Sequence, residues 1–355
     1  MDIDELYYQA VDLLKELIAT PSISREENNA ADIIERFFSN NGATPHRHGN
    51  NVWCIANDFN ESLPTLLLNS HIDTVKPASG WTRDPFSPDV DEEGKLYGLG
   101  SNDDGASLVT LLQVFYKICQ KPQRYNTIFL ASAEEEVSGA NGIEAVLPLL
   151  PPISCAIMGE PTSMQPAIAE KGLMVLDCVA EGVSGHAARN EGVNAIYKAM
   201  ADIEWFRNHN CSRTSELLGD VKMTVTQIEA GTQHNVIPDK CSFIVDVRSN
   251  ECYSNKELLE LIKSSVSSNV TARSTRLNSS AISVGHPLVK RALELGRKPY
   301  GSPTLSNQSL VRDIPTLKMG PGDTTRSHTA NEFVLISEIR DGIEKFCALL
   351  DGLKL

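Results

Sequence analysis

Side chains that bind metal ions recur along this chain, and most of them stand beside predicted turns. They are His71 and Asp73, the pair Asp103-Asp104, the run Glu134 to Glu136, Glu160 and His328. Imidazoles and carboxylates suit zinc, cobalt or manganese, and two-metal hydrolytic sites hold such ions about 3.5 to 4 Å apart, usually with a bridging carboxylate. The set therefore predicts a hydrolytic site for two divalent ions.

A charge count favours metal binding by this set. Two dications balanced by three ligand carboxylates and one hydroxide form a neutral cluster, which is easier to bury than lone carboxylates that repel one another. Metal coordination lowers the pKa of water from about 15.7 to about 7, whereas a general base alone supplies about 10² to 10⁴ in rate. We therefore expect the ions to activate water and a carboxylate to carry its proton.

The spacing of neighbouring donors suggests how these roles are divided. Adjacent Glu135 and Glu136 point in different directions, so only one of them needs to face a metal. Asp73, two residues after His71, is well spaced to orient the imidazole. Alone, such a pair is more typical of a structural hydrogen bond, and the other donors are what favour a metal site.

Predicted strands place these donors together. The apolar runs Thr65 to Ser70, Asn126 to Ser132 and Ile153 to Met158 each end beside a donor group. Ligands collect at the carboxyl ends of strands in open α/β sheets, so the three groups are expected to share one crevice.

Two patterns of predicted elements divide the chain. After two N-terminal helices, the second preceded by a capping box of Ser24 and Glu27, strands near 52–56, 65–70, 126–132 and 153–158 alternate with helices near 106–118 and 139–147. The next elements are a strand at 173–181, a helix at 193–208, strands at 221–230 and 241–248, a helix at 254–268 and a strand at 280–284. This βαββαβ order is ferredoxin-like. A helix at 287–297, an apolar run at Thr316 to Met319 and a helix from about 333 follow.

These patterns predict the domain organisation. Residues 1–171 and 285–355 would form a discontinuous α/β catalytic domain with a mainly parallel, helix-covered sheet, because His328 completes the donor set that His71 begins. Residues 172–284 would form an inserted ferredoxin-like α+β domain.

Composition narrows the class of protein. The chain has 355 residues, 41% of them hydrophobic, and a net charge of −14, which argues against binding to nucleic acid. It contains no apolar stretch long enough for a membrane span and no signal-peptide pattern at its start. The eight cysteines form no CxxC pair, which favours reduced thiols. We therefore expect a cytoplasmic enzyme with a small substrate and no membrane partner.

Six motifs in order carry a resemblance to a known family. They are HIDTV at 71, YGLGSNDD at 97, EEEVSGANG at 134, GEPTSMQP at 159, GVSGHAARNEGVNAI at 182 and GPGDTTRSHTANEF at 320. Over nearly its whole length the chain resembles the di-zinc amidohydrolases and exopeptidases that include acetylornithine deacetylase, succinyl-diaminopimelate desuccinylase and aminoacylase. The resemblance implies hydrolysis of a linear amide with two bound ions, Zn²⁺ in the first place and Co²⁺ or Mn²⁺ as alternatives.

The resemblance also implies a role for each donor. One metal would be held by His71, Asp103 and Glu160, and the other by Asp103, Glu136 and His328, so that Asp103 bridges. Glu135 would be the general base and Asp73 would support His71.

Two assignments have a neighbour that competes for the same role. Motif spacing favours Asp103 over Asp104 as the bridge, although Asp104-Gly105-Ala106 replaces the lysine and glycine that many relatives carry there. In the acidic triplet, Val137 aligns the last two residues with the family's Glu-Glu pair, so Glu134 is expected to be a solvated residue at a helix start.

The inserted domain resembles the family's lid and dimerisation domain, which implies a homodimer. His186 would help to polarise the scissile carbonyl in the partner subunit's site. Asn235 and Arg248 would recognise a substrate carboxylate, although Arg248 also fits a simple salt bridge. Gly320 and Gly322, in the GPGD turn, would offer backbone donors to the substrate.

The motifs are most similar to those of acetylornithine deacetylase, which implies deacetylation of N-acetylornithine in arginine biosynthesis. N-acetylcitrulline and the N-succinyl forms of ornithine and citrulline are alternative substrates. A di- or tripeptidase on the same site and a non-catalytic metal-dependent binding protein are alternative functions. A nucleotide loop at Gly98-Leu99-Gly100 is rejected, because the third glycine is absent and aspartates follow where a phosphate would lie.

Overall fold

The chain forms two compact units in the computed structural model, which describes residues 2–189, 191–311 and 314–355. Unit 1 comprises Met1–Ile168, Ile282–Tyr300 and Ser306–Leu355, and unit 2 comprises Ala169–Ala281 and Gly301–Leu305. The sequence placed the inserted domain at 172–284, three residues later than unit 2 at both junctions. It did not assign the short segment Gly301–Leu305 to that domain.

A nine-stranded sheet forms the centre of the α/β part, in the order β1-β2-β5-β3-β6-β16-β7-β14, with β15 beside β7. The strands are β1 His46–His48, β2 Asn51–Ile55, β3 Thr65–His71, β5 Asn126–Ser132, β6 Cys155–Met158, β7 Ala167–Glu170, β14 Ser280–Ala281, β15 Tyr300–Ser302 and β16 Thr316–Lys318. The central pairs β5–β3, β3–β6 and β6–β16 are parallel. The pairs toward the edges, such as β2–β5 and β16–β7, are antiparallel. The predicted α/β sheet is confirmed, and its parallel part is the central four strands β5, β3, β6 and β16.

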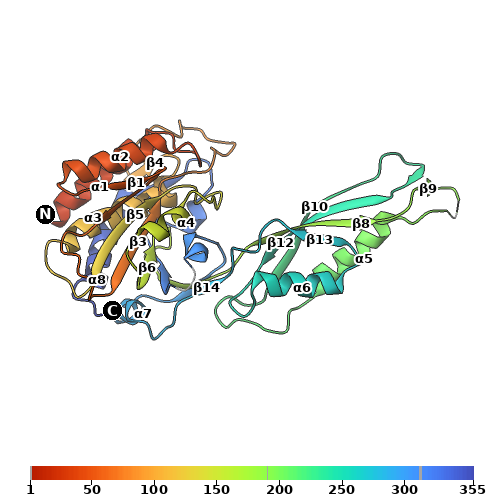
Figure 1. The fold of residues 1–355 in the computed structure, drawn as a ribbon. Helices are drawn as coiled ribbons and strands as arrows, with labels where there is room; N and C mark the ends of the chain where they lie inside the picture. Colours follow the sequence, from red (N-terminus) through yellow and green to blue (C-terminus); the bar gives the residue numbers. More distant parts are fainter. Residues whose placement is uncertain (1, 190, 312–313) are drawn as a thin grey trace. The chain divides into compact units, whose positions relative to one another are not determined.

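Alternate side chains of the central strands enter two apolar layers, because successive residues of a strand point to opposite faces. In β3, Leu66 and Leu68 belong to the larger layer and Leu67 to the smaller one. The larger layer includes residues of α1 (Ile3–Ile18), α2 (Asn28–Asn40), α3 (Ala106–Ile118), α7 (Pro287–Glu294) and α8 (Ile336–Leu350), and the smaller one residues of α4 (Ile143–Val146). Helices thus cover both faces of the sheet (Figure 1), which explains the continuous apolar runs of its strands.

The start of α2 differs from the predicted capping box. Ser24 Oγ donates to the Asp73 carboxylate at 2.7 Å, and Glu27 accepts from the N–H of Arg25 at 2.6 Å and of Glu134 at 3.2 Å. The helix begins at Asn28 without a side-chain cap. The prediction was wrong because both side chains bond to segments that carry candidate site residues.

Two predicted helices of unit 1 begin later than expected. The first, expected at 139–147, is reduced to α4, because residues before it fold back on Glu134: Gly139 N–H donates to the Glu134 carbonyl at 2.8 Å. The second begins at Ile336, because Phe333–Leu335 forms strand β17, antiparallel to β4 (Lys95–Tyr97).

Unit 2 contains a four-stranded antiparallel sheet in the order β10-β12-β8-β13 and two helices. Its elements are β8 Met174–Glu181, α5 Ala195–Asn208, β10 Lys222–Ala230, β12 Lys240–Arg248, α6 Asn255–Ser265 and β13 Asn269–Ala272. The βαββαβ order is as predicted, but its last strand is β13 rather than 280–284, where Ser280–Ala281 pairs with β7 instead. In β13 only Val270 is buried in the core of unit 2. One apolar residue is too short a pattern to predict a strand.

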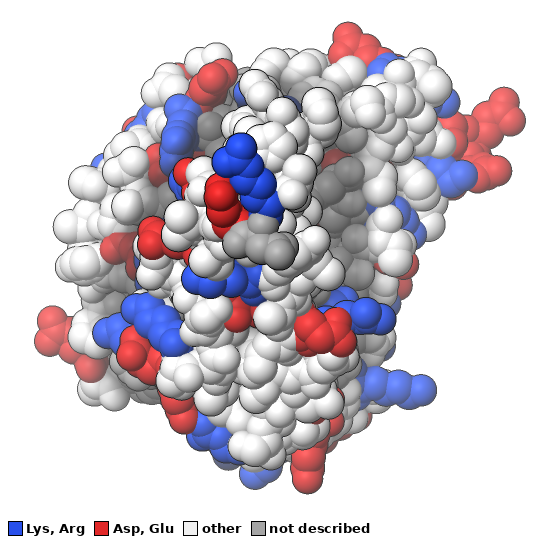
Figure 2. Space-filling model, turned by 90° about the vertical axis from the view of Figure 1, so that its right-hand side faces the viewer, with Lys and Arg blue, Asp and Glu red and all other residues white. Residues whose placement is uncertain are grey.

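Charged side chains of both signs are interspersed on the face of the molecule shown in Figure 2. Unit 2 contains several exposed ion pairs, including Arg273 with Asp177 at 2.9 Å and Arg213 with Glu257. Water screens such pairs, so they contribute little to stability. Among the described residues, no helix has the length and apolar character required to cross a bilayer.

Candidate metal centre

Three neighbouring parallel strands of unit 1 end at one edge of the sheet and lead into the candidate site. His71, the last residue of β3, is paired with Ser132, the last residue of β5. The loop after β5 carries the acidic triplet, and the loop after β6 carries Glu160. Donor atoms of His71, Glu135 and Glu160 consequently lie within 4.8 Å of one another, which is the crevice that the strand pattern predicts.

Asp103 lies between two imidazoles. Its Oδ1 is 3.3 Å from His71 Nε2, and its Oδ2 is 3.6 Å from His328 Nε2. His328 Nε2 also lies 3.0 Å from the Glu136 carboxylate, and His71 Nε2 lies 3.9 Å from Glu135 Oε2. Each oxygen of Asp103 thus faces a different histidine, as a bridging carboxylate requires.

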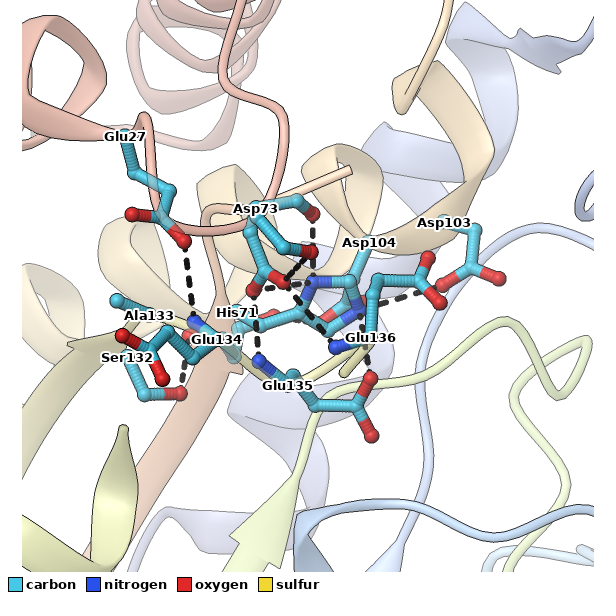
Figure 3. A network of polar contacts seen from close by, with 12 residues as sticks. Glu27, His71, Asp73, Asp103, Asp104, Ser132, Ala133, Glu134, Glu135 and Glu136 are labelled. Atoms are coloured by element: carbon cyan, nitrogen blue, oxygen red, sulfur yellow. Dashed lines mark hydrogen bonds and ion pairs between the residues drawn. The ribbon is translucent and has the colours of Figure 1, made fainter. Parts of the chain in front are cut away.

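The two aspartates of the pair have different surroundings (Figure 3). Asp104 is 1% exposed, and its carboxylate accepts a hydrogen bond from Ser70 Oγ. Burial raises the pKa of Asp104 to about 7. Asp103, in contrast, joins His71 and Glu136 in a group of donors with metal-binding spacing. This arrangement supports Asp103 as the bridge.

Asp73 holds the acidic loop as well as the imidazole (Figure 3). Its carboxylate accepts the N–H of Glu135 at 2.9 Å and the N–H of Glu136 at 3.1 Å. His71 Nδ1 lies 2.8 Å from the Asp73 carbonyl oxygen and 3.5 Å from Oδ1. An Nδ1–H that donates to this carbonyl leaves Nε2 to face Asp103 as a free lone pair. The sequence predicted that the Asp73 carboxylate orients the imidazole, whereas the shorter contact is to its backbone carbonyl. The bonds to both glutamates were not predicted.

Burial and repulsion from neighbouring carboxylates hinder the ionisation of three glutamates at this site. Burial, together with nearby Glu136 and Asp73, raises the pKa of Glu135 to about 8. Burial also raises the pKa of Glu136, and it raises that of Glu160 well above its usual value. A divalent cation beside these carboxylates would offset both the burial and the repulsion. The donor set therefore fits divalent metal ions.

Among the described residues, two groups each contribute one ligand atom per residue within 4.8 Å of one another: His71, Asp103 and Glu136, and His71, Glu135 and Glu160. They overlap with the predicted ligand sets but are not identical to them. Glu135, the predicted base, is in one group, whereas His328, a predicted ligand, is in neither. His328 is nevertheless within 3.0 Å of Glu136, so the second predicted set lies close together as well.

Comparison with known proteins identifies the family. The model of peptidase family M20/M25/M40 matches residues 67–352. The chain belongs to this family. Its members are metal-dependent hydrolases of amide bonds with two-metal sites, so the predicted amide hydrolase is confirmed at this level.

Individual M20/M25/M40 relatives include both deacetylases and peptidases. The acetylornithine deacetylases of Shigella sonnei and Pectobacterium carotovorum are 29% and 28% identical to this chain, and each alignment covers 91% of it and 92% of the relative. A tripeptidase from Staphylococcus aureus superposes with a TM-score of 0.79 at 21% identity, over 97% of both chains. The Bacillus subtilis YXEP protein, a dinuclear metal binding peptidase, gives 0.73 at 16% identity over 98% of both. The structural likenesses establish the fold.

Glu134 is buried in this M20/M25/M40 member rather than solvated as predicted. It is 7% exposed and has a φ of +55°, in the left-handed region. Its carboxylate accepts from Asn141 Nδ2 at 2.8 Å, and its N–H donates to Glu27. The prediction was wrong because Glu134 bonds to Asn141 and Glu27 inside the protein instead of facing water.

Two buried residues near the site, Glu332 and Lys318, were not predicted from the sequence. The Glu332 carboxylate accepts backbone N–H groups of the segment that carries Asp103, and burial, with the nearby Asp103 charge, raises its pKa to about 8. Lys318, in β16, is 2% exposed, and its positive charge opposes the rise in the pKa of Glu160. The position of Glu332 in the last family motif, four residues after His328, is a signal that could have identified it.

The predicted residues of the inserted domain lie in unit 2, at two separate places. Strand β9 (Gly185–His186) pairs with β11 (Val236–Ile237), and the N–H of Ala187 donates to the Asn235 carbonyl at 3.0 Å. His186 and Asn235 are therefore neighbours, and both are exposed. Arg248 is eight residues beyond Lys240 on β12, about 26 Å along the strand, and it forms hydrogen bonds of 2.8 and 3.1 Å with Asp246.

The GPGD turn packs against the loop that carries Glu160. Gly320 N–H donates to Thr162 Oγ1 at 3.1 Å, and the Gly320 carbonyl accepts from the N–H of Met164 at 2.9 Å. A Cβ at Gly320 would lie 2.6 Å from the carbonyl oxygen of Glu160, so only glycine permits this approach. Gly322 has a φ of +86°. The N–H of Gly320, a predicted substrate donor, is thus bonded within the protein.

Proposed function

We propose that the protein hydrolyses N-acyl amino acids, releasing a carboxylate and a free amine, and that its substrate is N-acetylornithine. This reaction belongs to arginine biosynthesis. The observation that carries the hydrolytic part is the position of Asp103, whose two oxygens face His71 and His328. The likeness to acetylornithine deacetylases along 91% of the chain supports the choice of substrate.

The residues proposed to hold two divalent ions, preferentially Zn²⁺, are His71, Asp103 and Glu160 for one and Asp103, Glu136 and His328 for the other. Such ions, when bound, lower the pKa of water and polarise a substrate carbonyl. Glu135 accepts the proton of the attacking water and returns it to the leaving amine. Glu135 suits this role because Asp73 fixes its backbone and because its carboxylate lies beside the proposed ligands, 3.9 Å from His71 Nε2.

The proposal extends to a homodimer that pairs through unit 2, in which His186 donates a hydrogen bond to the substrate carbonyl in the partner's site. The exposure of His186 and of apolar residues on α5, where Tyr197 is 71% and Met200 57% exposed, supports this part. Asn235, beside His186, and Arg248 lie far apart on one chain, so they would bind the substrate carboxylate from different subunits of the dimer. Arg248 would then exchange its bond with Asp246 for one with the substrate.

A substrate panel tests the proposed reaction. Metal-loaded protein is assayed with the acetyl and succinyl derivatives of ornithine, citrulline and diaminopimelate, and with unblocked di- and tripeptides. We expect the highest kcat/KM for N-acetylornithine, and metal-free protein is the control. Hydrolysis of unblocked peptides alone would favour the di- or tripeptidase alternative. Binding of the acyl compounds without turnover would instead identify a non-catalytic binding protein.

A mixing experiment tests whether His186 acts across the dimer. We expect His186→Ala to lower kcat by about 10²- to 10³-fold, as the loss of an oxyanion donor does. Co-expression of the inactive variants His186→Ala and Glu135→Gln should restore activity to about a quarter of the wild-type value, since half of the dimers are then hybrids with one intact site. If no activity returns although light scattering shows dimers, His186 does not act across the subunits.

A further inference from the structure

One carboxylate in unit 1 collects three backbone donors from the segment that carries Asp103. Glu332 Oε1 accepts the N–H of Asn102 and the N–H of Asp103, both at 2.9 Å, and Oε2 accepts the N–H of Gly100 at 3.2 Å. The Glu332 carbonyl accepts the N–H of Gly98 at 3.1 Å. Glu332 is 2% exposed, so these bonds form away from water.

The backbone conformation of this segment explains why it needs such a partner. Gly100 has a φ of +74°, and Asp103 (φ −120°, ψ 96°) interrupts the helical geometry of the turn Ser101–Gly105. N–H groups at such a place lack the regular helix ladder, and a buried N–H without an acceptor is costly. Glu332 thus supplies the hydrogen-bond acceptors for N–H groups that the irregular turn leaves without helical partners.

The same bonds connect the two sides of the candidate metal centre. Asp103 is bonded to Glu332 through its N–H, while its carboxylate faces His71 and His328. Glu332 and His328 are four residues apart on one segment, so one side chain links the position of Asp103 to that of His328. Both Glu332 oxygens already accept N–H donors, so the side chain is not arranged as a metal ligand.

We propose that Glu332 is a positioning residue of the metal centre, which fixes the backbone of Gly100 to Asp103 so that both oxygens of Asp103 can bridge two ions. This inference rests on the two-ion site of the proposed function. Glu332 has no contact with the substrate in this role and acts only through Asp103.

The experiment compares Glu332→Ala and Glu332→Gln with the wild type and with Glu338→Gln. Glu338 is a matched control, because it accepts the N–H of Leu335 at 3.0 Å and pairs with Arg326 at 2.7 Å without touching the Asp103 segment. Bound Mn²⁺ is counted by elemental analysis after dialysis at defined free concentrations. Electron paramagnetic resonance then distinguishes exchange-coupled ion pairs from isolated ions.

We expect Glu332→Ala to retain about one ion in place of about two, with the signal of isolated Mn²⁺ replacing that of the coupled pair. In Glu332→Gln the amide oxygen can still accept from Asn102 and Asp103, but the amide N–H₂ faces Gly100. This variant should therefore keep the coupled pair with about 10- to 100-fold weaker affinity. Glu338→Gln should match the wild type in both measurements.

Wild-type affinity and coupling in both Glu332 variants would overturn the inference, and so would an equal loss in Glu338→Gln. If the alanine variant does not fold, the glutamine variant decides by the same two measurements. The metal readout does not depend on turnover. A wild-type protein that binds a coupled pair but hydrolyses nothing in the substrate panel would therefore contradict the proposed function alone.

Discussion

Substitution of Asp103 by asparagine is expected to reduce the bound metal from about two ions per chain to less than about one, and to lower kcat/KM by at least about 10⁴-fold. The reason is geometric and electrostatic. Asp103 directs one oxygen toward His71 and the other toward His328. An amide N–H₂ in place of one oxygen cannot bind a cation, and the lost charge weakens the second ion too. Elemental analysis and steady-state kinetics measure the two effects.

Asp104→Asn is the matched control for this prediction. Asp104 has the same side chain one residue later, but it is bonded to Ser70 and belongs to neither group of donors with metal-binding spacing in the described chain. We expect this variant to keep about two ions and to lose no more than about tenfold in kcat/KM. If Asp104→Asn lost its ions while Asp103→Asn kept them, the bridging role would belong to Asp104.

Substitution of Glu135 by glutamine is expected to lower kcat by about 10²- to 10⁴-fold while the protein keeps its metal. Glutamine has nearly the same shape, so the backbone bond from Glu135 to Asp73 should persist. It cannot accept a proton from water, however, so nucleophile formation slows. The kinetic measurement is paired with metal analysis of the same samples.

Glu136→Gln is the counterpart that separates the two neighbouring roles. Glu136 contacts His328 at 3.0 Å and is proposed as a ligand, so this variant should lose metal as well as activity. An undiminished kcat in Glu135→Gln would refute its role as base. Loss of metal from Glu135→Gln would instead make it a ligand, in keeping with the group that it forms with His71 and Glu160.

The structural features that were predicted correctly are those that a short stretch of sequence determines. Strands β3 and β5 were read from unbroken apolar runs because parallel strands in the middle of a sheet are buried on both faces. The donors follow these strands directly, so predicting the strands also predicted that His71, Glu135 and Glu160 would meet. Chain order and residue type were sufficient for this part of the site.

The features that sequence missed depend on bonds between distant segments. Ser24 bonds to Asp73, 49 residues away, and the N–H of Glu134 bonds to Glu27, 107 residues away, so the expected helix cap and solvated glutamate were both wrong. Glu332 reaches Asp103 over 229 residues. A local sequence pattern does not show which distant residues a side chain will contact. Tertiary hydrogen bonds therefore override the preference of a serine for a helix cap or of a glutamate for solvent.

The place of β16 in the sheet determines which part of the protein can fold first during its synthesis. β16 (Thr316–Lys318) lies between β6 and β7, so the nine-stranded sheet has a gap until the ribosome has passed residue 318. All strands of the four-stranded sheet, in contrast, lie between Met174 and Ala272. Because domains fold as they emerge, the insertion can fold while its host is still open. His328 is translated later still, so the nascent chain lacks the complete proposed donor set until this residue has been made.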